Sequence, residues 1–126
     1  MGLREAFAYL GEEAPQESIV VADTPKAFQL FCERYGRSDL VFQPFSVKKL
    51  TLAEDGVYFF LLQPGRRYLE NHKIYHLISQ RFSPVYVVRI RGLEAVSIYR
   101  IEGREALSQL APLVSIQGEE ERGEKQ

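Results

Sequence analysis

A run of six apolar residues, Val57 to Leu62, constrains the fold more than any other part of this sequence. Gly56 precedes the run and Pro64-Gly65 follows it closely, so its shortness and its flanking breakers predict a strand. Alternate side chains of a strand point to opposite faces of its sheet, and here both faces are apolar. Helices can cover one face, and the other must then meet a further helix, a second subunit or a ligand surface.

Helix and strand signals alternate on both sides of this run. Helices are predicted at residues 3–10, 24–36 and 66–81 and from residue 103, and strands at 18–22, 40–52, 57–63, 85–91 and 95–101. Turn residues at 53–56 and 92–94 suggest two hairpins. The sequence therefore predicts an α+β fold, with a mainly antiparallel sheet of four or five strands and helices packed on one face.

The length of 126 residues is typical of one domain. We expect residues 1–17 to form an N-terminal helical arm and loop, and residues 18–117 to form a single α+β binding domain. Residues 118–126 are almost entirely polar and rich in Glu, so they predict a disordered acidic tail.

The sequence favours a cytoplasmic protein that does not interact with membranes. A membrane-spanning helix needs about 20 consecutive apolar residues, and acidic residues interrupt the N-terminus where a secretory signal would be apolar. Cys32 is the single cysteine, which excludes an internal disulfide framework and a cysteine-based zinc site. Cys32 lies on the apolar stripe of the helix predicted at 24–36, so we expect it in the core.

The net charge of −1 conceals a strong division along the chain. Residues 24–101 carry a net charge of +6, whereas residues 1–23 carry −4 and residues 102–126 carry −3. A basic body between acidic ends suggests an anionic partner. A chance division of surface charge is the alternative explanation.

Aromatic and cationic residues alternate through the basic middle of the chain. The set comprises Phe42, Phe45, Lys48, Lys49, Tyr58, Phe60, Arg66, Arg67, Tyr68, Lys73, Arg89, Arg91 and Arg100. Aromatic rings stack on unpaired bases, and Arg and Lys neutralise phosphates, so both kinds of residue on one surface are typical of single-strand binding. Alternatively, the rings belong to the core and the cations form a solvated rim.

We therefore predict a non-catalytic, sequence-tolerant protein that binds single-stranded DNA or RNA. The alternative is a protein-interaction or assembly subunit that buries the second apolar sheet face against a partner. The sequence contains no nucleophile elbow and no phosphate-binding loop, and it implies no cofactor. His72 and His76 are four residues apart, with Glu70 nearby, which leaves a metal-dependent nuclease as a weaker hypothesis.

Over residues 18–114 the chain resembles the ThermoDBP-related proteins of thermophilic archaea. The resemblance lies in the order of elements: a short strand, a helix that opens with Thr24-Pro25 and closes at Gly36, then a basic and aromatic sheet. The helix that follows Pro64-Gly65 lies between the hairpins. An excess of Arg over Lys agrees with a thermophilic origin.

The resemblance implies binding of single-stranded DNA or RNA in a cleft with aromatic pockets and basic edges. It also implies a homo-oligomer, of two or more subunits. The founding member uses a C-terminal leucine zipper, whereas this chain has only Leu107, Leu110 and a polar tail at that end. An oligomer of this chain would therefore form in another way.

Overall fold

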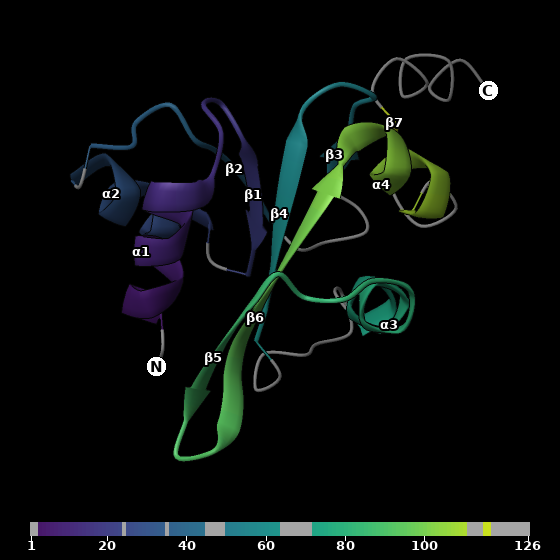
Figure 1. Ribbon diagram of the computed structural model, residues 1–126. Coiled ribbons are helices and arrows are strands. Elements are labelled where there is room, and N and C mark those ends of the chain that lie inside the picture. Colours follow the sequence, from purple (N-terminus) through teal and green to yellow (C-terminus); the bar gives the residue numbers. More distant parts are fainter. Residues whose placement is uncertain are drawn as a thin grey trace.

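The computed structural model describes residues 3–23, 25–34, 36–44, 50–63, 72–110 and 115–116, and it has an α+β fold (Figure 1). Its elements are α1 (Leu3–Glu13), β1 (Ile19–Ala22), α2 (Pro25–Arg34), β2 (Val41–Pro44), β3 (Thr51–Leu52), β4 (Val57–Leu62), α3 (His72–Arg81), β5 (Tyr86–Ile90), β6 (Leu93–Glu102), α4 (Gly103–Leu110) and β7 (Ser115–Ile116). Within the described ranges, no helix combines the length and the apolar character that crossing a bilayer requires.

The main sheet has five strands in the order β2-β1-β4-β6-β5, and it is mixed. Strand β1 runs parallel to both β2 and β4, while β6 runs antiparallel to β4 and β5. The prediction of a mainly antiparallel sheet was therefore wrong about β1. Helix α2 carries the chain back from the end of β1 to the start of β2, and such a crossover makes consecutive strands parallel.

Helices cover both faces of the sheet, whereas the sequence predicted helices on one face (Figure 1). On one face, Tyr58, Phe60 and Leu62 of β4 pack with buried residues of α3 and α4. On the other, Phe59 and Leu61 pack with residues of α1 and α2. The helix predicted as an arm, α1, packs on this second face through Ala6, Phe7 and Leu10. The second apolar face of β4 is thus buried within the chain.

The strand predicted at 40–52 is not continuous. The structure has β2 at its start and β3 at its end, and residues 45–49 between them lie outside the described residues. The turn predicted at 53–56 is present, but β3 pairs with β7 rather than with β4, so this turn does not close a hairpin. The second predicted hairpin, β5–β6, is confirmed.

Cys32 is buried, with 3% of its surface exposed, as the apolar stripe predicted. Desolvation by burial raises the pKa of its thiol to about 11. The thiol is therefore protonated at neutral pH, and it acts as a small apolar side chain of the core.

Arg37 joins the end of α1 to the segment that leads into β2. Helix α2 closes at Gly36, whose φ of 86° lets the backbone turn so that the Arg37 amide donates to the Cys32 carbonyl. The Arg37 guanidinium donates to carbonyl oxygens at the end of α1, including those of Leu10 and Gly11, and it forms an ion pair with Asp39 at 2.9 Å. One side chain thereby satisfies carbonyls that the end of a helix would leave without partners.

Replacing Asp39 with asparagine should reduce stability most at neutral pH. Hydrogen bonds from Arg37 and from the Glu17 amide hold the pKa of the Asp39 carboxyl well below its usual value near 4. A lowered folded-state pKa stabilises the fold above about pH 4, and this contribution falls as the pH drops further. In urea titrations from about pH 7 to 2, the stability difference between Asp39→Asn and the wild type should narrow. For Asp55→Asn, a control in an exposed turn, a small difference at every pH is expected.

Candidate functional site

The two ends of the strands define two edges of the molecule. Parallel strands β1 and β4 end at Ala22 and Leu62, and we call this end the carboxyl edge. Leu62 pairs with Ser97, and β6 continues past it to the β5–β6 turn, so that turn projects beyond the carboxyl edge (Figure 1). The opposite end, where β1, β2 and β4 begin and β6 ends, is the amino edge.

A polar cluster lies at the carboxyl edge, just after β1 and β4. The Tyr75 hydroxyl donates to Asp23 Oδ2 at 2.6 Å and accepts from the Gln63 amide at 3.0 Å. These bonds fix the first turn of α3 to the ends of two strands. Gln63 Oε1 is buried and accepts no hydrogen bond in the described part of the chain. An unsatisfied buried acceptor is uncommon, and here it lies beside the edge that gathers the cations described next.

Three helices begin at the carboxyl edge, and each has a cation in its first turn. Helix α2 starts at Pro25, three residues after β1 ends, α3 is fixed there by Tyr75, and the first turn of α1 lies toward the same end (Figure 1). The cations are Arg4, Lys26 and Lys73, all exposed. Only α1 has an acidic residue in its first turn. Cations are unfavourable at the positive end of a helix dipole, so local stability does not explain their placement.

The β5–β6 turn adds two further cations, Arg89 and Arg91. Arg91 and Gly92 form its two-residue loop, with φ of 54° and 84°. Positive φ at both positions is typical of a type I′ turn, in which Asn-Gly is favoured and a long side chain at the first position is strained. Strained residues of this kind concentrate at functional sites.

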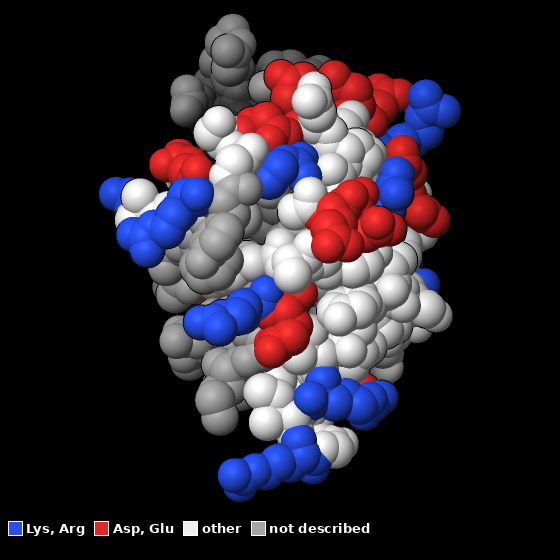
Figure 2. Space-filling view, turned by 60° about the vertical axis from the view of Figure 1, so that its left-hand side comes forward, with Lys and Arg blue, Asp and Glu red and all other residues white. Residues whose placement is uncertain are grey.

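The amino edge has the opposite character. Its acidic residues are Glu12, Glu13, Glu17, Asp39, Glu54, Asp55, Glu102 and Glu105. Three arginines pair with them, as Arg37–Asp39, Arg100–Glu102 and Arg104–Glu54, while Arg34 at the end of α2 forms no ion pair with a described residue. The view in Figure 2 shows acidic side chains gathered over the upper part of the molecule and mainly Lys and Arg at the lower end.

The cations of the carboxyl edge are mostly unpaired among the described residues. Arg89 pairs with Glu94 at 3.4 Å, while Arg4, Lys26, Lys73 and Arg91 form no ion pair there. Glu5 and Asp23 are further acids near this edge. Among the described residues, charge is therefore separated along the strand direction, with unpaired positive groups mainly at the carboxyl edge.

The structure brings together only part of the predicted site. Lys73, Arg89 and Arg91 lie at the carboxyl edge, but Arg100 lies near the amino edge, 5.9 Å from the centre of the Phe59 ring. Phe42 is partly buried against the core. The remaining predicted residues, Phe45, Lys48, Lys49, Arg66, Arg67 and Tyr68, lie outside the described residues.

Two of the predicted stacking rings are unavailable to a ligand. Tyr58 and Phe60 are 1% and 0% exposed in the core that α3 and α4 cover. Their assignment as base-stacking residues was wrong, because this face of β4 is covered by helices and not by a ligand. The Tyr58 hydroxyl accepts a hydrogen bond from the Ala53 amide, which accounts for its polar group.

Sequence reasoning missed Arg4 and Lys26. Lys26 directly follows Pro25 in the first turn of a predicted helix. A cation there is unfavourable for the helix, and this could have marked Lys26 as a candidate for binding an anion. It also missed the stacked pair Tyr9–Tyr86, with ring centres 4.6 Å apart, which joins α1 to β5. No short-range pattern in the sequence places these two rings together.

The histidine pair does not form a metal site with other described residues. His72 and His76 are exposed on α3 with ring centres 6.5 Å apart. No group of three or more His, Cys, Asp or Glu residues suited to a metal ion occurs in the described ranges. Glu70, the third predicted ligand, lies outside them.

No protein family model, curated protein or solved structure matches this chain. The resemblance to the ThermoDBP-related proteins therefore stays a prediction from the order of elements.

Replacing Arg91 with asparagine should raise stability by about 1 kcal/mol, because Asn adopts positive φ more readily than Arg. The melting temperature should then rise by about 3–5 °C in calorimetry. If Arg91 contacts a ligand, the same variant should bind polyanions more weakly. An unchanged or lower melting temperature would show that the turn does not strain Arg91.

Proposed function

We propose that the protein binds single-stranded nucleic acid, and that the phosphates lie along the carboxyl edge. The observation that carries this proposal is the separation of charge between the two edges. Arg37, Arg100 and Arg104 at the amino edge pair with acids, whereas Arg4, Lys26, Lys73 and Arg91 at the carboxyl edge form no ion pair with a described residue. Their placement at the starts of helices costs stability, and an anionic partner accounts for that cost.

A single strand suits this edge better than a duplex does. The cations come from separate elements: α1, α2, α3 and the β5–β6 turn. An unpaired strand is flexible enough to follow such uneven positions, and its bases remain available for stacking. Phe45 and Tyr68 are the predicted rings that remain for this role, together with the cations Lys48, Lys49, Arg66 and Arg67. The chain leaves β2 at Pro44 and β4 near Gln63, both at the carboxyl edge, and enters these segments.

The alternative of an assembly subunit loses its main support. It depended on an apolar sheet face left for a partner, and α1 and α2 cover that face. In this proposal the protein is non-catalytic and cytoplasmic. A homo-oligomer is part of the proposal only through the resemblance, and light scattering will test it separately.

The direct test is fluorescence anisotropy with labelled oligonucleotides of one length: single-stranded DNA, single-stranded RNA and duplex DNA. Salt is varied from about 25 to 300 mM. We expect tighter binding to the single strands, and an affinity that falls linearly on logarithmic axes as salt rises. Absence of binding at the lowest salt would refute the proposal. Equal affinity for the duplex would refute its single-strand part.

A further inference from the structure

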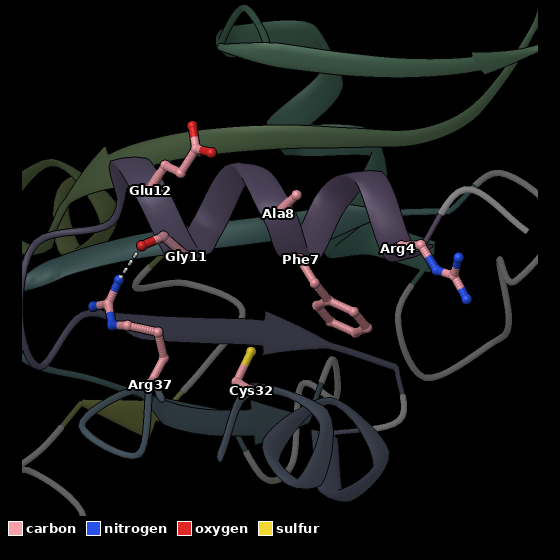
Figure 3. A pocket seen from close by; sticks show the side chains of 7 residues that line it. All are labelled: Arg4, Phe7, Ala8, Gly11, Glu12, Cys32 and Arg37. Atoms are coloured by element: carbon pink, nitrogen blue, oxygen red, sulfur yellow. Dashed lines mark hydrogen bonds between the residues drawn. The ribbon is translucent and has the colours of Figure 1, made fainter. Parts of the chain in front are cut away.

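A pocket lies between α1 and α2, on the sheet face opposite to α3 and α4 (Figure 3). Its volume is about 440 Å³, within the range of small-molecule sites. Phe7 and the Cys32 sulfur point into the gap between the two helices, and Gly11 forms part of the wall that α1 contributes (Figure 3). The described residues that line the centre of the pocket are therefore mainly apolar.

Gly11 is in α1, and no described neighbour requires a glycine there. A glycine within a helix costs about 0.5–1 kcal/mol relative to alanine. Its φ is not positive, and a Cβ built on it would meet no atom within 4 Å. By contrast, Gly36 has positive φ, and Gly103 has backbone oxygens against it. The space beside Gly11 is open, so a small side chain fits there and only a large one would fill it.

The two ends of the pocket differ in charge. At one end, Arg4 is exposed and forms no ion pair with any described residue. At the other end, the Arg37 guanidinium already donates hydrogen bonds to Asp39 and to carbonyl oxygens at the end of α1. It therefore has no N–H group left to donate to a ligand. Glu12 points away from the gap in Figure 3, and it lies about 12 Å along the helix from Arg4. Arg4 extends outward past the start of α1 in Figure 3, so an anionic group near Arg4 would lie at the mouth of the pocket at that end.

We propose that this pocket binds a small molecule with an apolar body and a single anionic group. The apolar body lies against Phe7, Gly11 and Cys32, and the carboxylate, sulfonate or phosphate pairs with Arg4. Apolar walls with a few placed polar groups are the usual composition of small-molecule sites. The proposal shares Arg4 with the carboxyl edge, and its other residues, Phe7, Gly11 and Cys32, are not part of the proposed nucleic-acid interface. The Gly11 variants therefore test the pocket independently of nucleic-acid binding.

Two fluorescent probes with the same ring system test the proposal. Anilinonaphthalene sulfonate carries an anionic group, and N-phenyl-1-naphthylamine is its neutral counterpart. Gly11→Leu fills the pocket, and Gly11→Ala is the matched control that removes the glycine but leaves most of the space. Arg4→Gln removes only the positive charge. Calorimetry confirms that each variant unfolds cooperatively, so that probe binding to a loosened core is recognised.

We expect the wild type and Gly11→Ala to bind both probes, and Gly11→Leu to bind both about tenfold more weakly. Arg4→Gln should lose about tenfold in affinity for the sulfonate and less than about twofold for the neutral probe. Equal binding by Gly11→Leu and Gly11→Ala would refute the site. An equal effect of Arg4→Gln on both probes would refute the anionic part.

Amide NMR gives a readout that is independent of probe fluorescence. Titration with decanoate, an acyl carboxylate, should displace the sulfonate probe and shift the amide signals of Phe7, Gly11 and Cys32. The Arg104 amide, at the amino edge, is the internal control. Shifts confined to the carboxyl edge, without change at Gly11 and Cys32, would place the anion outside the pocket and overturn the proposal.

Discussion

Replacing Gly103 with alanine should lower the free energy of unfolding by about 3–4 kcal/mol, because the new methyl group has no space. A Cβ at this position would lie 2.4 Å from the carbonyl oxygen of Ala53, and 2.8 and 2.9 Å from those of Glu54 and Asp55. These atoms belong to the backbone of the turn that leads into β4, so they cannot move aside as a flexible side chain would. The Gly103 amide also donates to the Gly56 carbonyl at 2.9 Å, which holds α4 close to this turn.

Urea denaturation with a fixed protein concentration will measure the effect. Gly11→Ala is the matched control, since the same substitution there meets no atom and should stabilise α1 by about 0.5–1 kcal/mol. The two variants should therefore change stability in opposite directions. If the free energy of unfolding of Gly103→Ala is within about 1 kcal/mol of the wild-type value, the turn and α4 can move apart at low cost.

The triple variant Lys73→Ala, Arg89→Ala, Arg91→Ala should bind a single-stranded oligonucleotide about 100-fold more weakly at about 100 mM salt. Each phosphate contact to a single strand contributes about 0.7 to the slope of log affinity against log salt. Three lost contacts should therefore reduce the slope by about 2. Relative to about 1 M salt, a slope lower by about 2 corresponds to about 100-fold lower affinity at about 100 mM. Salt titrations of the variant and the wild type will measure both quantities.

The control for this variant removes the same net charge from elsewhere in the chain. Arg34→Ala, Arg100→Ala, Arg104→Ala changes three arginines of α2, β6 and α4, of which Arg100 and Arg104 pair with acids at the amino edge. It should retain the slope and lose little affinity. An equal loss in both triple variants would show that net charge, and not the carboxyl edge, governs binding.

The local parts of the fold could be predicted from the sequence. Thr24-Pro25 and Gly36 bracket α2, and the breakers around Val57 to Leu62 bracket β4, because these signals depend only on neighbouring residues. The parallel pairing of β1 was missed, although the order strand, helix, strand over residues 19–44 is the usual signal for it. Strand β1 has only four residues, and its position between β2 and β4 was not predicted.

The candidate site was less predictable than the fold, for two physical reasons. Period-two alternation shows that both faces of β4 are apolar, but it cannot tell whether a helix or a ligand covers each one, and Tyr58 and Phe60 were misassigned for that reason. The gathering of Lys26, Lys73 and Arg91 at one edge depends on strand directions and on where helices start. That information is set by topology and is absent from local spacing.

The opposite charges of the two strand ends give the molecule an electric dipole moment along its strands. In the field of a polyanion, such a dipole experiences a torque before contact, which turns the carboxyl edge toward the phosphates. Productive orientation would then precede collision, and salt would slow association far more than it would speed dissociation. The acidic amino edge would then face away from the bound nucleic acid. Its negative charge would repel a second nucleic-acid strand.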